Sequence, residues 1–584
     1  MVAYPIVMLS ELDDIEGRNS AILDVPLSTG SPDCIQLARE WITECWRHHH
    51  KECPNETSRS ARFVPSRLLY VGDNMSSVLR LRDSSRIKES TAQFKYLALS
   101  HCWGDNVIKD FQKLTTNNKE LWEDCIDEAT LPLNFRDAIM FTRQVGCNYL
   151  WVDSLCIIQD DKNDWVRESE KMGHVYANAY CTISSSGSVD ATGGCFHERN
   201  PFTSIPCYLR VSDMNGLAIR ANKDTYNKNT FGVEVDSGPL SKRAWTFQER
   251  LLSQRIVHFT KTTLFFECNT HFASEVVRGG VRYSERRENR SSPLVESRYD
   301  PTTGYRAAFN ALKARQSPEL STHEEFELHE SWFSLIAKYT SCKLTHADDR
   351  LIAIFGISKA IIDSPEEQPL IYWEGLWHRH LLFDLLWCLE TEPAPRPTPP
   401  RAPSWSWGAV DGRIGDRLTH RVKDNGRLIA TFEKAATIVN HLRPPGRIVL
   451  GCLILPINHI ERSNHSERQY ILQYNFKIET PVDETPKDAI LELCCMPDTT
   501  TDFETLTDLY CAELLRIVDK LDVQYQTSKR SGRSEGIVLR RTRISTEPGM
   551  ASEYMRVGRF WAEWTEDFDG FGIFQLSKED CIVF

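Results

Sequence analysis

The chain has 584 residues, which is too long for one hydrophobic core, so two to four domains are expected. Hydrophobic residues make up 41% and charged residues 26% of the sequence, and this balance excludes a mainly disordered chain. The 81 acidic residues outnumber the 69 basic ones, and the net charge of -12 argues against a nucleic-acid partner.

The cysteines and the N-terminus indicate the compartment. The 18 cysteines are scattered along the chain and form no short disulfide framework. The N-terminal segment lacks the basic start of a secretory signal and soon turns acidic. The longest apolar run, which begins at Leu381, is interrupted by Asp384 and falls short of the ~20 residues that span a bilayer. We therefore expect a cytoplasmic protein with buried free cysteines and no membrane partner.

Strands and helices alternate from Tyr96 onward. In chain order, the patterns predict a strand over 96–100, a helix over 132–145, a strand over 149–152, a helix that Asn163 or Asp164 caps, a strand over 180–185, a helix from its cap Ser241 to Leu252, and a hairpin over 255–268. Such alternation predicts an α/β domain with a mainly parallel sheet and helices on both faces. In these sheets ligands bind beyond the carboxyl ends of the strands, here residues 101–105, 153–160 and 184–187.

Four segments follow from the change of pattern along the chain. They are an N-terminal extension packed on the core (1–92), the α/β domain (93–275), a charged excursion with a helical segment and a Pro-rich connector (276–403), and a β-rich C-terminal domain (404–584). Helices are expected near 332–339, 349–362 and 373–389. Alternating apolar residues predict antiparallel strands beyond the connector, with QTSKRSGRSEG as a solvated hairpin loop and SWSWG as an aromatic strand.

Three longer motifs resemble a known family. They read YLALSHCWGD, LPLNFRDAIMFTRQVGCNYLWVDSLCIIQDD and RAWTFQERLLS, and they resemble the signature blocks of the fungal heterokaryon-incompatibility (HET) domain in content and spacing. A looser resemblance continues through LTHADDRLIAIFGI, YWEGLWHRHLLFDLLW and RAPSWSWGAVDG, to about residue 560. The resemblance implies intracellular self/non-self recognition that leads to programmed cell death in filamentous fungi.

HET domains also distantly resemble TIR domains, which have a flavodoxin-like fold. Some TIR domains cleave NAD with a glutamate on a helix that carries a Trp-Cys-x-x-Glu pattern. Here Trp245 and Glu249 keep the spacing, and Thr246 stands in place of the cysteine. The resemblance implies a TIR/flavodoxin-like core, followed by the helical segment and the antiparallel β domain. It also implies that NAD is a possible substrate, and no bound cofactor is expected.

The chemistry of Glu249 fits this implication. On a helix Trp245 and Glu249 share a face, so an aromatic ring lies beside a carboxylate. Cleavage of the N-glycosidic bond of NAD passes through an oxocarbenium-like state that a carboxylate stabilises, and nicotinamide leaves without a general acid. The alternative is a solvated helix face on which Glu249 pairs with Arg243, Arg250 or Arg255.

Further residues are candidates for substrate binding. Gly104 permits a positive φ in the loop after the first strand, Asp153 is placed to bind a ribose, and Arg243 is suited to a phosphate. The alternatives are a tight turn that Trp103 covers, and an Asp153 that caps a helix or pairs with an arginine. The full set of substrate-binding candidates is Ser100, Trp103, Gly104, Asp105, Asp153, Gln159, Arg243, Trp245 and Gln248.

Cysteines raise two other possibilities. Cys156 follows Asp153 closely, but no histidine spacing singles out a cysteine hydrolase, and SLCII is typical of a buried segment. Cys45, His49 and Cys53 have a C-x3-H-x3-C spacing that suggests zinc binding, because residues at such steps share one helix face. A fourth ligand is missing, with His48 and His50 nearest, and helical cysteines beside Trp46 are also typical of a core. No metal site is therefore assigned.

Two functions remain open at the level of the sequence. The first is a HET effector whose core is an NAD glycohydrolase with Glu249 as the catalytic residue. The second is a non-enzymatic HET adapter or assembly module in self/non-self recognition. Its partner would be a second copy of the chain or another incompatibility protein. The chain lacks the G-x-G-x-x-G pattern of a Rossmann dinucleotide site.

Overall fold

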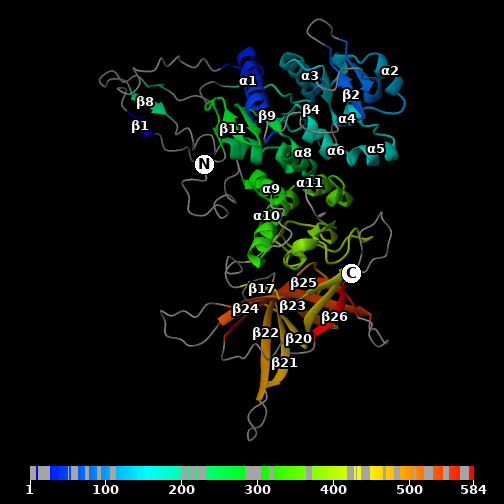
Figure 1. The fold of residues 1–584 in the computed structure, drawn as a ribbon, viewed down its shortest axis with the longest axis vertical. Coiled ribbons are helices and arrows are strands. Elements are labelled where there is room, and N and C mark those ends of the chain that lie inside the picture. The colour runs from blue at the N-terminus through cyan, green and yellow to red at the C-terminus, as the bar shows by residue number, and fades with distance from the viewer. Residues whose placement is uncertain are drawn as a thin grey trace. The chain divides into compact units, whose positions relative to one another are not determined.

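The structure is a computed structural model of the chain (Figure 1). It describes residues 8–10, 26–49, 52–53, 63–72, 78–87, 94–104, 113–199, 208–209, 217–220, 230–282, 304–314, 321–363, 371–416, 418, 426–428, 431–435, 448–463, 469–478, 487–503, 508–518, 531–543, 552–565 and 578–583. Two compact units are present. Unit 1 holds Met1–Ala307, Cys342–Thr345 and Ile352–Ala360, and unit 2 holds Ala308–Ser341, His346–Leu351 and Ile361–Phe584. The boundaries of the four segments expected from the sequence remain a prediction.

Unit 1 is built on a nine-stranded sheet. Its strands, in spatial order, are β12 (Val281–Arg282), β11 (His271–Ser274), β10 (Leu264–Cys268), β9 (Arg255–Phe259), β6 (Cys181–Ser184), β4 (Tyr96–Ser100), β5 (Tyr149–Trp151), β2 (Arg67–Tyr70) and β3 (Arg80–Asp83). The central strands β9, β6, β4 and β5 are parallel, and the outer pairs are antiparallel. The expected mainly parallel central sheet is thus confirmed, and β9 and β10 form the expected hairpin.

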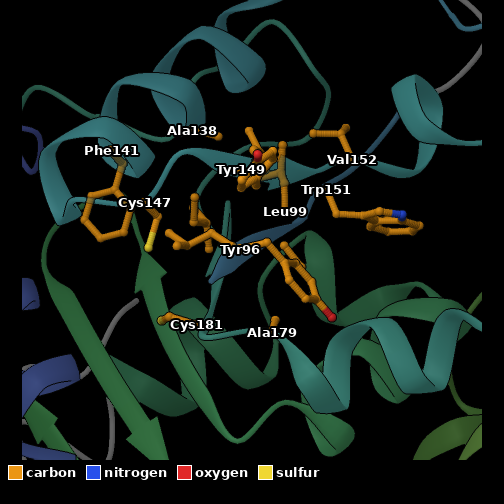
Figure 2. Packing of buried hydrophobic residues seen from close by; sticks show 14 of the residues in the cluster. Tyr96, Leu99, Ala138, Phe141, Cys147, Tyr149, Trp151, Val152, Ala179 and Cys181 are labelled. Carbon is orange, nitrogen blue, oxygen red and sulfur yellow. The ribbon is translucent and has the colours of Figure 1, made fainter. Parts of the chain in front are cut away.

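Helices cover both faces of this sheet. On one face lie α1 (Pro32–His48) and α3 (Leu133–Val145), where Trp41 stacks on Phe266 and Phe141 contacts Phe259. Figure 2 shows Phe141 on this side of the central strands. On the other face lie α6 (Met172–Asn178) and α8 (Ala244–Leu252), where Tyr176 contacts Trp151. Because alternate residues of a strand point to opposite faces, each strand contributes to two apolar layers.

Shorter elements complete unit 1. They are α2 (Lys119–Asp124), α4 (Asp153–Cys156), α5 (Lys162–Ser169) and a small sheet of β1 (Met8–Ser10), β7 (Tyr208–Leu209) and β8 (Leu217–Arg220). Two expected helix caps are wrong. Asp161, and neither Asn163 nor Asp164, caps α5, because its carboxylate accepts the N–H groups of both residues. Ser241 donates its hydroxyl to the carbonyl oxygen of Asp236, so α8 begins later, at Ala244.

Unit 2 begins with helices and ends in a large sheet. Helix α10 (Thr322–Thr340) starts at a capping box of Ser321 and Glu324. Helices α9 (Gly304–Ala314) and α11 (Ile352–Ile362) each span a boundary between the units. The sheet contains β17 (Gly426–Leu428), β18 (Thr431–Ala435), β19 (Ile448–Pro456), β20 (His459–Arg462), β21 (Tyr470–Ile478), β22 (Lys487–Pro497), β23 (Leu509–Val518), β24 (Ser531–Arg543), β25 (Ser552–Thr565) and β26 (Lys578–Val583). All pairs except β25–β26 are antiparallel, as the period-2 pattern predicts.

The helix expected over 373–389 is wrong. Instead β13 (Tyr372–Trp373) and β14 (Leu376–Trp377) form a tight hairpin, because Glu374 and Gly375 have φ of 44° and 98°. A single helical turn, α12 (Leu381–Asp384), and the strand β15 (Cys388–Leu389) follow. β15 pairs with β16 (Ile414–Gly415).

Two loop and strand expectations also fail. SWSWG is a turn, which contains Trp405, followed by a short 3-10 helix, Trp407–Ala409. The indoles of Trp405 and Trp407 are both fully buried. Of QTSKRSGRSEG, residues 526–530 lie outside the described part. The remainder belongs to β24, where buried Glu535 accepts a hydrogen bond from Arg559 (2.9 Å).

Candidate active site at the carboxyl ends of the central strands

Polar residues form a row across the sheet where β4 and β6 end. Ser100 lies opposite Ser184 in the register, and Ser184 lies opposite His258 of β9. The chain runs from β4 to β5 on one side and later returns to β6 on the other, so the strand order reverses here. In open α/β sheets this reversal is where ligands bind.

Glu249 lies at this row, on the inner face of α8. The Ser100 hydroxyl donates to its carboxylate, and the Tyr176 hydroxyl lies within hydrogen-bonding reach. Only 5% of the residue is exposed. Burial, helped by the nearby charge of Asp153, raises the pKa of the Glu249 carboxyl from 4.5 to about 7, although Ser100 and Arg243 oppose the shift. The solvated helix face considered for Glu249 is therefore wrong.

Asp153 contacts both the loop that follows β4 and the start of α4. One carboxylate oxygen accepts the indole N–H of Trp103 (2.8 Å), and the other accepts the backbone N–H of Ser154 (2.7 Å). The latter oxygen lies 3.9 Å from Nδ1 of His101. Burial lowers the pKa of His101 to about 4, so this ring is neutral at pH 7. Its Nε2 is buried and has no hydrogen-bond partner among the described residues.

Arg243 brings a positive charge to the same loop. It occupies the N-cap position of α8, and its Nη1 donates to the carbonyl oxygen of His101 (2.8 Å). The N-terminus of α8 is held in place because the Ala244 N–H donates to the carbonyl oxygen of Lys343 (3.0 Å). Glu249, Asp153 and Arg243 therefore belong to one electrostatic group.

The other candidates have different surroundings. Gly104 has φ of +92°, and a Cβ there would lie 2.7 Å from the Cβ of Asp190, so the loop requires glycine. Gln159 donates to the carbonyl oxygens of Asp153 (3.1 Å) and Ile157 (2.9 Å). Trp245 is partly buried against the apolar core of unit 1. Asp105 lies outside the described residues.

Gln248 faces away from the Glu249 group. Its amide donates to the carbonyl oxygen of Ala353 (2.9 Å) and accepts the N–H of Gly173 (3.1 Å). It therefore joins α8 to α11 and to α6. The structure thus brings together Ser100, Trp103, Asp153, Arg243 and Glu249, and it uses Gln248 for packing.

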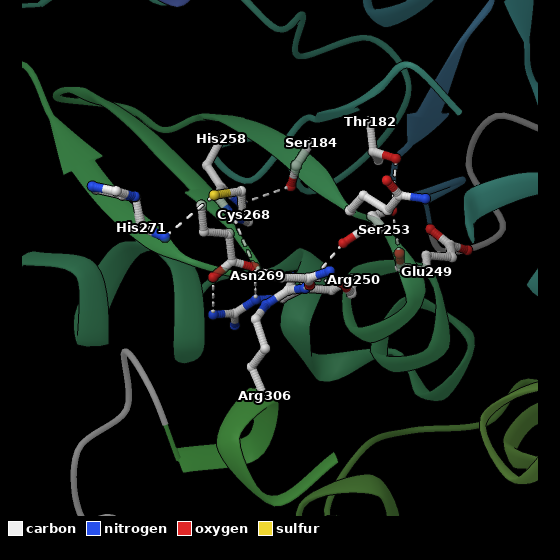
Figure 3. Close-up of polar contacts among 12 residues, drawn as sticks. Thr182, Ser184, Glu249, Arg250, Ser253, His258, Cys268, Asn269, His271 and Arg306 are labelled. Carbon is white, nitrogen blue, oxygen red and sulfur yellow. Dashed lines mark hydrogen bonds and ion pairs between the residues drawn. The ribbon is translucent and has the colours of Figure 1, made fainter. Parts of the chain in front are cut away.

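A second polar network was missed by the sequence analysis. Nδ1 of His258 lies 3.1 Å from the Ser184 hydroxyl and 3.2 Å from that of Ser186, and its Nε2 lies 3.5 Å from Glu267. Arg250 binds Glu267 through two nitrogens (2.9 and 3.0 Å). Figure 3 shows Ser184 bonded to His258, near Arg250 and Arg306. No motif joins these residues, because they come from separate strands and helices.

Cys156 behaves as a core residue. It is 1% exposed, and burial raises the pKa of its thiol to about 12. A thiol in this state is protonated at neutral pH and unreactive. This environment supports the buried, unreactive role that the sequence favoured for Cys156.

The fold and the candidate site together define a class of protein. It is a mixed α/β protein whose central parallel strands end at a buried carboxylate, a second carboxylate and an arginine. Residues 96–249 match the family described as heterokaryon incompatibility protein (HET), so this part of the chain is similar to a HET domain. No curated protein and no solved structure matches the chain significantly. Within the described residues, every helix is too short or too polar to cross a membrane.

Proposed function

We propose that this chain is a cytoplasmic effector of heterokaryon incompatibility whose α/β core cleaves the N-glycosidic bond of NAD. The HET match supports a role in incompatibility and cell death. Across the sheet, the four parallel strands lie in the order second, first, third and fourth of the chain, which is the order of flavodoxin-like folds and supports the resemblance to TIR domains. The observation that carries the catalytic part is the buried carboxylate of Glu249 at the carboxyl end of β4.

Glu249 acts in this proposal through its charge. The bond from ribose C1′ to the nicotinamide nitrogen breaks, and the electron pair stays on that nitrogen, so neutral nicotinamide leaves. The ionised carboxylate stabilises the cationic ribosyl group, and water then adds at C1′ and releases a proton. The Ser100 hydroxyl holds the carboxylate in position. The products are nicotinamide and ADP-ribose.

The surrounding residues supply binding. Asp153 begins α4 just after β5, where a carboxylate is suited to a ribose hydroxyl, and Arg243 supplies positive charge for the diphosphate. Trp103, oriented by its bond to Asp153, offers an aromatic surface. The cationic nicotinamide ring favours ionisation of Glu249, which lowers its pKa when substrate binds.

A non-enzymatic adapter is the second candidate, and it too rests on an observation. The bonds of Ser100 to Glu249, and of Thr182 to Ser253 (2.6 Å), also fix α8 on the sheet. If these contacts are structural only, the domain acts by associating with itself or with another incompatibility protein. Loss of the Glu249 charge then leaves signalling intact.

Expression in a fungal host separates the two candidates. The variants are Glu249→Gln and Glu168→Gln. Glu168 is a matched control, since it is also buried and accepts a hydroxyl bond, from Ser66 (2.8 Å). The proposal predicts NAD loss and death with wild type and Glu168→Gln, and neither with Glu249→Gln at equal protein level. Death without NAD loss, equal for all three chains, supports the adapter. NAD loss with Glu249→Gln excludes the catalytic role.

A further inference from the structure

Four buried side chains, none of them part of the candidate active site, meet beside the antiparallel end of the sheet of unit 1. Cys45 lies in the last turns of α1, and His49 follows directly. Cys53 comes one turn later, tied back by its N–H to the carbonyl oxygen of His49 (2.7 Å). Cys268 is the last residue of β10. None of the four is more than 6% exposed.

The ligand atoms of three of these side chains lie close enough together to bind one metal ion. One ligand atom from each of Cys45, His49 and Cys268 lies within 4.8 Å of the others. Sγ of Cys268 is 3.5 Å from Nδ1 of His49. Tetrahedral zinc with ligand distances of about 2.3 Å to sulfur and 2.0 Å to nitrogen separates the two atoms by about 3.5 Å. Cys53 lies next to this group of three. Its thiol is 3.9 Å from the carbonyl oxygen of Gln254 and within hydrogen-bonding reach of both Cys45 and Cys268, so it is available as the fourth ligand.

Backbone groups at β10 are arranged for a thiolate. The N–H of Thr270 (3.4 Å) and the N–H of His271 (3.2 Å) both donate to Sγ of Cys268. Figure 3 shows the bond from His271. Two donors aimed at one sulfur stabilise negative charge there, as the outer hydrogen bonds of metal sites do.

A buried arginine supplies the matching charge. Arg255 is 1% exposed, and it donates to the carbonyl oxygens of Tyr180 and Cys53 (3.2 Å each). It forms no ion pair with a carboxylate in the described part of the chain. A buried cation without a counter-charge is costly. Three thiolates, one neutral imidazole and Zn²⁺ carry a net charge of −1, which this guanidinium neutralises.

We propose that Cys45, His49, Cys53 and Cys268 bind one Zn²⁺ in a closed Cys3His site. Three sulfurs and one imidazole select zinc over the hard cations, and four protein ligands leave no position for a substrate, so the role is structural. The ion fastens α1 to β10. All four ligands lie outside the HET match of residues 96–249, so the site is an addition to that domain.

Cys268 is the ligand that the spacing alone did not reveal. His48, a neighbour considered for the fourth position, has a side chain that is 60% exposed and pairs with Glu44. His50 lies outside the described residues.

The test is made on the purified full-length chain from zinc-supplemented cells. Elemental analysis should give one zinc per chain. X-ray absorption should give three sulfurs near ~2.3 Å and one nitrogen near ~2.0 Å. This measurement needs no variant and so does not depend on a variant's folding. A chain without bound metal, a site of oxygen ligands, or a disulfide between Cys45 and Cys53 overturns the proposal.

Variants identify the ligands. Cys268→Ser and Cys45→Ser should lose the zinc, whereas Cys156→Ser, an equally buried cysteine outside the cluster, should keep it. His49→Cys should keep the zinc and change its absorption spectrum to four sulfurs. Full zinc content in Cys268→Ser, with an unchanged spectrum, overturns the assignment of that ligand.

Discussion

At the scale of single residues, Glu249 is held in a state that disfavours folding. Its carboxyl has a pKa of about 7 in the folded chain and 4.5 as an ordinary glutamate. The folded state therefore binds more protons between these values, and stability falls as pH rises through this window. Such a cost is typical of a group kept for function.

Glu249→Gln should therefore be folded and no less stable than wild type at pH 8. Glutamine keeps the shape and can accept the Ser100 bond, and it removes a buried charge whose cost is on the order of 1–3 kcal/mol. The measurement is urea unfolding of both chains at pH 5 and pH 8. Wild type should lose stability between the two values, whereas the variant should show a smaller loss. A variant that is far less stable than wild type at pH 8 contradicts this account.

The sequence predicted Glu249 but could not predict its surroundings. The four-residue step from Trp245 to Glu249 is local, so it is visible in the sequence. Ser100 and Tyr176 come from β4 and α6, and only the sheet register and helix packing bring their hydroxyls to the carboxylate. Cys268 was hidden in the same way, because its partners on α1 lie far away in the chain.

At the scale of elements, Gln248 makes α8 part of a three-helix joint. Gly173 of α6 and Gly356 of α11 leave the room that its side chain fills. A Cβ at Gly356 would lie 2.7 Å from the Gln248 amide atoms. The sequence suggested a ligand contact for this amide, because a glutamine next to the candidate glutamate gives no sign of which helix face is covered.

Gly356→Ala should destabilise unit 1. Alanine favours a helix by about 1 kcal/mol over glycine, but here it displaces the buried amide and breaks its two bonds. The expected net loss is about 1–3 kcal/mol. Thermal unfolding measures it, with Gly279→Ala as a control, since nothing lies within 4 Å of a Cβ at that glycine. If the variant is as stable as wild type, the Gln248 side chain does not stabilise the packing of α8 against α6 and α11.

A histidine between two carboxylates fixes α10 within unit 2. His329 lies 2.9 Å from Asp384 and 3.2 Å from Asp416. Burial opposes the charge, but the two carboxylates prevail and raise the pKa of His329 from 6.5 to about 9. Its contribution to stability is complete below pH 6.5 and is lost as pH rises through about 9.

Unit 2 should therefore weaken under alkaline conditions. Hydrogen exchange of α10 should be faster at pH 10 than at pH 7 after correction for the intrinsic rate, with a loss on the order of 1–3 kcal/mol. His329→Gln should be weaker at both values and show little further change. The exposed His346 gives the control variant, His346→Gln. If the amides of α10 in wild type are equally protected from hydrogen exchange at pH 7 and pH 10, a charged His329 does not stabilise this helix.

Pattern strength explains which elements could be predicted. The long strands β19 to β25 alternate apolar and polar residues over many positions, and the parallel strands are compact apolar runs, so both were found. The segment 373–389 is rich in large apolar residues, and this composition does not separate a helix from short buried strands. The turn at Glu374 and Gly375, together with Asp384, which accepts the Trp377 N–H (2.9 Å), decides the structure there.

At the scale of the whole molecule, the helical segment and the C-terminal sheet form one unit. Arg556 of β25 is fully buried and donates to the carbonyl oxygens of Leu385 (2.6 Å) and Trp387 (2.7 Å). Its guanidinium also lies 3.5 Å from the centre of the Trp387 ring, and its Nε pairs with Asp498 (3.1 Å). These contacts cross the residue 404 boundary that the sequence suggested.

A fragment of residues 308–584 should fold on its own, whereas a fragment of 404–584 should not. The shorter fragment lacks the two carbonyl groups and the ring that Arg556 needs, which leaves a buried charge without most of its partners. Urea unfolding and near-ultraviolet circular dichroism measure the difference. If the shorter fragment unfolds in a cooperative transition equal to that of the longer one, the helical segment and the C-terminal sheet do not form one folding unit.

The proposed cleavage of NAD depends on the charge of Glu249. The most direct measurement is nicotinamide release from NAD by the purified full-length chain, at pH values below and above 7. At NAD concentrations well below KM, where the free enzyme's pKa governs the rate, wild type and Glu168→Gln should release nicotinamide at equal rates that rise with pH as the Glu249 carboxyl ionises near pH 7. Glu249→Gln should be slower by ~10²–10³-fold without this pH dependence. Wild type that releases no nicotinamide, or a Glu249→Gln chain that releases it as fast as wild type, would contradict the claim.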